Sequence, residues 1–140
     1  MGVPVKPSDR QLLFDLRKAL LHLHKTLLDW ERAAYERVHG RVSAVELLKV
    51  IVEDSQFAWL RPISELIVRI DSTVDTEEPD STIDVGALVA RAREVVSPAG
   101  AGSTQAQRYL AALQEHPDAV FAHRAVTNIL KSHPPQETAH

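Results

Sequence analysis

The feature that most constrains the fold is an uninterrupted helical pattern from Asp9 to His39. Apolar side chains recur every seven residues along three seams, and at 100° per residue these seams cover about half of the helix circumference. A surface helix needs an apolar stripe of only about 100°, so one neighbouring helix cannot cover all three seams. The helix must therefore lie at the centre of the fold or contact a second copy of the chain. The first seam is Leu13, Leu20, Leu27 and Ala34, the second is Leu16, Leu23 and Trp30, and the third is Phe14, Leu21, Leu28 and Tyr35.

A ladder of polar residues, Arg17, His24 and Glu31, runs within the apolar arc with the same spacing of seven. In one interpretation these long side chains pair with charges on a partner helix and fix its register. In the other, His24, Glu31 and Tyr35 line a pocket for a ligand or a metal. Residues seven apart are separated by about 10 Å along the axis, so such a pocket would need residues from another helix.

The rest of the chain predicts an all-α fold, a bundle of five or six helices around this long N-terminal helix. Ser43 and Glu46 form a capping-box pattern that begins a short helix, which we expect to form a hairpin with the first. Its expected apolar side is Leu47, Leu48, Val50 and Ile51, and a core helix follows with the stripe Trp59, Leu60, Ile63, Leu66, Ile67, Ile70 and Val74.

Three further helical patterns follow in the second half of the chain. Asp84 or Thr82 is expected to cap a helix that runs to Val96, and Pro117 either begins a new helix or kinks one that runs from 104 to 132. The last segment is expected to bury Phe121, Ala125, Val126, Ile129 and Leu130.

Length and composition favour a single helical domain over 1–140, with flexible ends at 1–8 and 133–140. The net charge of −3 supplies no general attraction to nucleic acid. The chain has no cysteine, which excludes thiolate chemistry and zinc knuckles. No signal peptide or membrane span is recognisable, so we expect a cytoplasmic protein without a membrane partner.

No motif of the chain predicts catalysis, a metal or a cofactor. Glu36 and His39 form a single Glu-x-x-His spacing, whereas a diiron bundle needs two such pairs and two further glutamates. The loop from 97 to 103 lacks the lysine of a phosphate loop, and no nucleophile-elbow motif marks a serine. We therefore expect no catalytic residue, and an enzyme is the less favoured interpretation.

The segment QFAWLRPISELIVRID resembles small uncharacterised bacterial helical proteins, and the resemblance extends over about residues 20–71. It brings no activity and no functional residue to this chain. What it implies is a bacterial cytosolic protein.

The sequence thus leads to one functional hypothesis and one alternative. The hypothesis is a helical protein-interaction or scaffold module that forms a homodimer through the third seam, with Arg17 reaching Glu31 of the second copy. The alternative is a helical bundle that binds a small molecule or a metal. The candidate interface or pocket residues are Arg17, His24, Glu31, Tyr35, Phe14, Leu21 and Leu28.

Overall fold

The computed structural model describes residues 7–75, 85–97 and 103–132, and within these ranges the chain forms six α-helices, one short 3-10 helix and no strand. This confirms the predicted all-α bundle with a long N-terminal helix. The expected capping residues Thr82 and Asp84, and the predicted flexible end 133–140, lie outside the described residues. The elements are α1 (Pro7–His39), α2 (Ala44–Glu53), η1 (Ser55–Leu60), α3 (Arg61–Asp75), α4 (Val85–Val95), α5 (Thr104–Glu115) and α6 (Pro117–Lys131).

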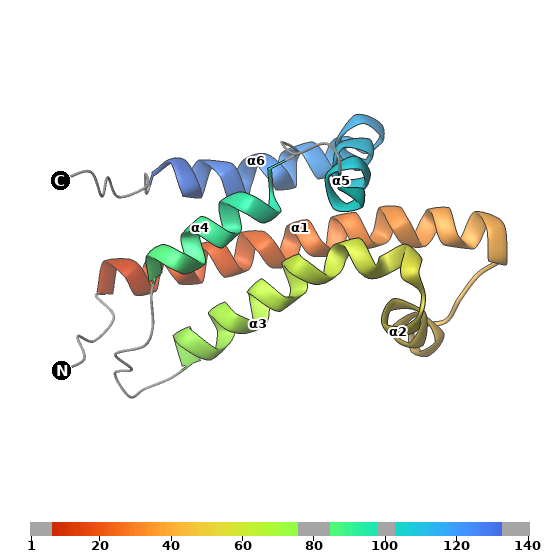
Figure 1. The fold of residues 1–140 in the computed structure, drawn as a ribbon, viewed down its shortest axis with the longest axis horizontal. Coiled ribbons are helices and arrows are strands. Elements are labelled where there is room, and N and C mark those ends of the chain that lie inside the picture. The colour runs from red at the N-terminus through yellow and green to blue at the C-terminus, as the bar shows by residue number, and fades with distance from the viewer. Residues whose placement is uncertain (1–6, 76–84, 98–102, 133–140) are drawn as a thin grey trace.

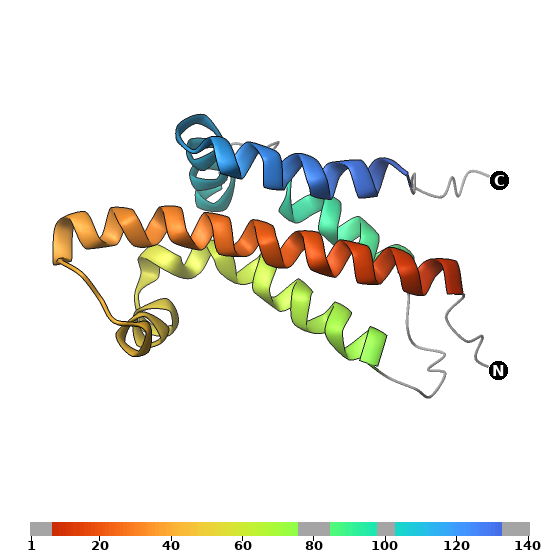
Figure 2. The same ribbon diagram turned by 180° about the vertical axis from the view of Figure 1, so that it is seen from behind.

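Helix α1 is the central element of the bundle. It begins at Pro7, two residues before the predicted start and within the predicted flexible end. In Figure 1 it runs along the length of the molecule with α3 on one side and α6 on the other, and Figure 2 shows the same arrangement from behind. It packs most extensively against these two helices, and also against η1 and α5. Neighbours within one chain therefore cover its first two seams, in which Leu13, Leu16, Leu20, Leu23 and Leu27 are fully buried.

The connection from α1 to α2 differs from the predicted hairpin. Gly40 ends α1 with a positive φ of 85°, as its position after the helix predicts. Arg32 donates to the Val42 carbonyl at 2.7 Å, and the Val42 amide donates to Glu36 at 2.9 Å, so the connecting chain is held against α1. Ser43 caps α2 as predicted, but α2 packs mainly against η1 and buries none of its residues completely.

The core helix of the second layer is α3, preceded by η1. Regular helix begins at Arg61, which leaves Pro62 in the first turn, where its missing N–H leaves no backbone carbonyl of the helix unpaired. Every residue of the predicted stripe from Trp59 to Val74 is buried. The opposite side of α3, with Arg61, Glu65 and Arg69, is exposed to solvent.

The last segment forms two helices, α5 and α6, which are separated at His116, and Pro117 is the first residue of α6. The predicted buried side of α6 is wrong at two positions, because Phe121 and Ala125 are exposed. The side that faces the core instead carries two alanines and two larger aliphatic residues, and it packs extensively against α1. The residues that α6 buries are Ala119, Ala122, Val126 and Leu130.

Candidate functional site

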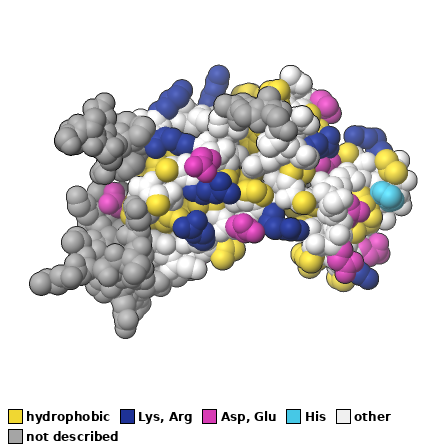
Figure 3. All heavy atoms as spheres, in the orientation of Figure 1, with side chains coloured by type: hydrophobic (Ala, Val, Ile, Leu, Met, Phe, Trp, Pro, Cys, Tyr) yellow, Lys and Arg dark blue, Asp and Glu magenta, His cyan; other side chains and the backbone are white. Residues whose placement is uncertain are grey.

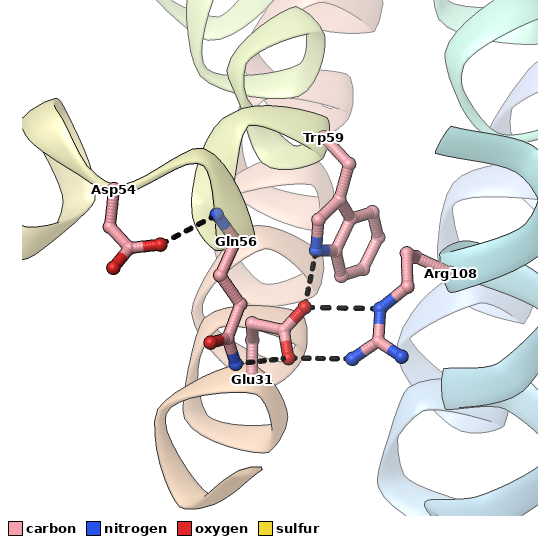
Figure 4. Close-up of polar contacts among 5 residues, drawn as sticks. All are labelled: Glu31, Asp54, Gln56, Trp59 and Arg108. Atoms are coloured by element: carbon pink, nitrogen blue, oxygen red, sulfur yellow. Dashed lines mark hydrogen bonds and ion pairs between the residues drawn. The ribbon is translucent and has the colours of Figure 1, made fainter. Parts of the chain in front are cut away.

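The polar ladder of α1 ends in a buried carboxylate, Glu31, whose side chain is fully enclosed. From η1, the Trp59 indole donates to its Oε1 at 2.7 Å and the Gln56 amide donates to its Oε2 at 3.2 Å. From α5, Arg108 donates through Nε to Oε1 at 3.2 Å and through a terminal nitrogen to Oε2 at 2.6 Å. Figure 4 shows the carboxylate of Glu31 between η1 and α5, with all four donors directed at it.

Two tryptophan rings and the N-terminal cap of η1 lie around the donors of this carboxylate. The Arg108 guanidinium lies 4.6 Å from the ring centre of Trp30, and Trp30 meets Trp59 edge to face at 6.2 Å. Asp54 accepts from the backbone amide of Gln56 at 2.8 Å, which fixes the start of η1. Each oxygen of Glu31 thus accepts two hydrogen bonds from protein donors. One of the two donors at each oxygen belongs to the Arg108 guanidinium, which is a cation. The carboxylate is thus satisfied by donors of its own chain.

Arg17, the first member of the ladder, is paired with α3. It donates to Asp71 at 2.6 Å, and its guanidinium lies 5.0 Å from the ring centre of Phe14. The proposed reach of Arg17 to Glu31 of a second copy is therefore wrong. Glu31 is enclosed by donors of its own chain, and Arg17 has its acidic partner on the neighbouring helix.

His24, the middle member of the ladder, is partly buried. Burial lowers the pKa of its imidazole, because desolvation disfavours the charged form. Among the described residues, the hydrogen bonds of Glu31 and the ring contacts of Tyr35 are made with other side chains than His24. The structure therefore separates the three residues that were expected to line one pocket.

Tyr35 lies near the end of α1 and stacks on His39 with ring centres 4.3 Å apart. It also contacts Phe57 of η1, at 5.8 Å between ring centres. Its outer side borders an open hollow of about 240 Å³ between α1 and α2, whose other lining residues are Lys49, Val50, Glu53 and Asp54. This hollow contains none of the other predicted pocket residues.

The third seam of α1 is divided between core and surface. Leu28 and Tyr35 are partly buried against the hydrophobic core, whereas the side chains of Phe14 and Leu21 are 37% and 49% exposed. Phe14 and Leu21 flank Arg17 at three and four residues along α1, and Val68, which is 61% exposed, lies three residues before Asp71 on α3. The Arg17–Asp71 ion pair joins the two helices that carry these exposed side chains, and we call Phe14, Leu21 and Val68 together the α1–α3 patch.

Three polar residues of this interior, Arg108, Tyr109 and His123, are not among the predicted site residues. Arg108 of α5 is the cation that neutralises Glu31, and no motif of the sequence marked it for this role. Tyr109 of α5 meets His123 of α6 with 2.7 Å between its hydroxyl oxygen and Nδ1, and burial raises the pKa of Tyr109 and lowers that of His123. This pairing depends on how α5 and α6 cross, which helical periodicity does not give.

Searches against protein-family models, curated proteins and solved structures find no match to this chain. Within the three described ranges, no three histidine or carboxylate side chains gather as metal ligands would. No helix among the described residues is long and apolar enough to cross a membrane.

Proposed function

We propose that this protein is a helical interaction or scaffold module that self-associates through the α1–α3 patch. The observation that carries the proposal is a contrast within one helix. The charges of the polar ladder, Arg17 and Glu31, are paired inside the chain, while Phe14 and Leu21, which flank Arg17, stay exposed. Exposed apolar side chains that lie together next to charges already paired within the chain are typical of a surface that contacts another protein.

The composition of the patch supports contact with protein. Arg10 and Arg17 both lie over the ring of Phe14, at 6.0 and 5.0 Å from its centre. Aromatic and arginine side chains are the types that protein interfaces favour, because they combine a large apolar area with directed hydrogen bonds. A second copy of the chain is the partner that the proposal names, since a two-fold interface needs only one such patch on each molecule.

The test is the molar mass of the purified protein at tens of micromolar, measured by light scattering coupled to gel filtration. We expect a dimer for the wild type and a smaller mass for the variant Leu21→Glu with Val68→Glu, because it places four carboxylates in the shared contact. Leu28 is left unchanged, since it packs against the core. A matched control is Leu110→Glu on α5, where the side chain is 40% exposed and lies outside the patch. A monomeric wild type, or a variant whose mass equals that of the wild type, would refute this interface.

The alternative function, binding of a small molecule or a metal by the bundle, has no specific observation in its favour. The carboxylate of Glu31 is enclosed by donors of its own chain, and the hollow beside Tyr35, which is open to solvent, has neither His24 nor Glu31 in its lining. The cytoplasmic location stays a prediction from composition and from the bacterial resemblance.

A further inference from the structure

The buried carboxylate of Glu31 lies among polar and aromatic side chains that α1 and η1 provide together. Trp59 and Gln56 donate to it from η1, and Trp30 of α1 meets Trp59 edge to face. Asp54 accepts from the backbone amide of Gln56 and so fixes the start of η1, and η1 packs against both α1 and α2. None of these contacts involves α5. We call Glu31, Gln56, Trp59 and Trp30 the Glu31 frame.

Arg108 of α5 brings a cation to the Glu31 frame from outside it. The Arg108 guanidinium donates through two nitrogens to the two oxygens of Glu31 and lies over the ring of Trp30, 4.6 Å from its centre. A planar guanidinium can reach both carboxylate oxygens and rest on an aromatic ring, whereas an ammonium is a single point charge. The carboxylate is fully enclosed, but 37% of the Arg108 side chain is exposed. The guanidinium therefore occupies its position from the solvent side.

Helix α5 is held to the bundle by few large side chains. It buries two alanines and one tyrosine, and the tyrosine hydroxyl pairs with His123 of α6. Two alanines bury little apolar area, so α5 is bound less firmly than α3, which buries a stripe of large apolar residues. Figures 1 and 2 show α5 lying across α6 rather than along the bundle. His116, whose backbone is extended, separates the two helices and is the residue at which α5 can turn.

We propose that the Glu31 frame is a binding site for an arginine side chain of a partner protein, and that α5 is a lid whose Arg108 fills this site in the closed form. When α5 turns at His116, the buried carboxylate loses its cation and the ring of Trp30 loses the guanidinium that lies over it. A buried carboxylate is costly without an opposite charge, so an arginine that enters restores the ion pair. The partner thus replaces Arg108 and holds the lid open.

The chemistry of the Glu31 frame identifies the ligand as a guanidinium. A lysine ammonium offers no fork for two carboxylate oxygens, and a neutral group leaves the buried charge unpaired. At the right of Figure 3, over α2 and the end of α1, acidic side chains lie among basic ones, so this surface does not repel a cation as a wholly basic one would. The Glu31 frame shares no residue with the α1–α3 patch, so it can be tested whether or not the protein self-associates.

The site is tested in the variant Arg108→Ala, which removes the internal guanidinium. The probe is N-acetyl-arginine methylamide, exchanged against N-acetyl-lysine methylamide at a constant total concentration so that the ionic strength does not change. Trp30 and Trp59 are the two tryptophans of the chain, so intrinsic fluorescence reports on the site directly. We expect saturable binding of the arginine probe, with a dissociation constant on the order of millimolar and at least about tenfold below that of the lysine probe. A response that does not saturate, or equal affinities for the two probes, would overturn the proposal.

A control variant and a rescue experiment complete the binding test. Arg124→Ala removes an exposed arginine of α6 and keeps Arg108 in place, so it should show no saturable response at probe concentrations that saturate Arg108→Ala. Equal binding by the two variants would locate the probe elsewhere and overturn the site. If Arg108→Ala is unfolded, the arginine probe should restore its helix content in circular dichroism, because a ligand that binds only the folded state stabilises it. Rescue that fails, or that the lysine probe gives equally, has the same negative meaning.

The lid is tested by hydrogen exchange of the wild-type protein. The slowest amides of α5 should exchange at least about tenfold faster than the slowest amides of α1 and α3, because α5 opens while the rest of the bundle stays folded. If the slowest amides of α5 exchange at the same rate as those of α1, α5 opens only in global unfolding. Arg108 would then be a permanent part of the core, and the proposal would be wrong.

Discussion

Replacement of Glu31 by glutamine tests whether the buried carboxylate stabilises the fold. The substitution keeps the size of the side chain and exchanges one of its two acceptor oxygens for an NH₂ group that can only donate. Each oxygen of Glu31 accepts two hydrogen bonds, so one pair of donors loses its acceptor whichever way the amide turns. One donor in each pair belongs to Arg108, so its charge also loses the opposite charge.

The expected loss of stability follows from these contacts. Two hydrogen bonds to a charged acceptor contribute about 1.5–3 kcal/mol each, which sets the loss at about 3–6 kcal/mol. Arg108 keeps 37% of its side chain exposed and can regain water, so the lower end of that range applies. We therefore expect Glu31→Gln to lower the free energy of unfolding by about 3 kcal/mol, a large part of the roughly 5–15 kcal/mol of a typical domain.

The assay is urea denaturation followed by circular dichroism, with the slope of the transition as a check that unfolding stays cooperative. The matched control is Asp29→Asn on the same helix, where the acid pairs with Lys25 at 3.3 Å and both side chains are well exposed. That exposed pair should contribute less than about 0.5 kcal/mol. A loss below about 1 kcal/mol for Glu31→Gln would refute the reasoning, since it would mean that the four donors gain nothing from the charge.

Two further predictions concern the core and pH. Leu20→Ala should lower the free energy of unfolding by about 2–5 kcal/mol, because Leu20 is fully buried. Leu21 is the next residue and is half exposed, so Leu21→Ala should lower it by under about 1 kcal/mol in monomeric protein. Equal losses for the two variants in urea denaturation would contradict the assigned buried and exposed sides of α1. Burial lowers the pKa of His24 and of His123 below the ordinary value of 6.5, so the unfolded chain binds more protons. Stability present above pH 6.5 should therefore fall as the pH drops toward 5, by at most about 1.4 kcal/mol per pH unit for each histidine, and His123→Gln should remove its share of that slope. A slope unchanged by that substitution would contradict the assignment.

Periodicity predicted the parts of the fold that depend on one helix at a time. The first two seams of α1 and the stripe of α3 were predicted correctly, because each pattern repeats over several turns and so fixes which side of the helix is buried. In the shorter helices the pattern did not fix which side is buried. In α6 the large ring of Phe121 suggested the wrong side. In α2 the prediction of Leu48 on the same side as Leu47, Val50 and Ile51 is wrong, because Leu48 is 67% exposed and only the other three pack against the core.

The polar ladder shows why partners between helices escaped prediction. Arg17 and Glu31 were correctly located within the apolar arc, but a regular spacing of seven suggested one common partner, a second copy of the chain. In the fold, each charge meets a different element: Arg17 pairs with α3, and Glu31 receives donors from η1 and α5, including Arg108, which lies 77 residues further along the chain. The spacing of residues along a helix determines the direction in which a side chain points. The partner of that side chain depends on which other element packs against the helix at the same position along its axis. A ladder of this kind therefore marks the places where successive elements pack against the central helix. The surface available to another molecule is formed by the apolar side chains of that helix that no element of the same chain covers.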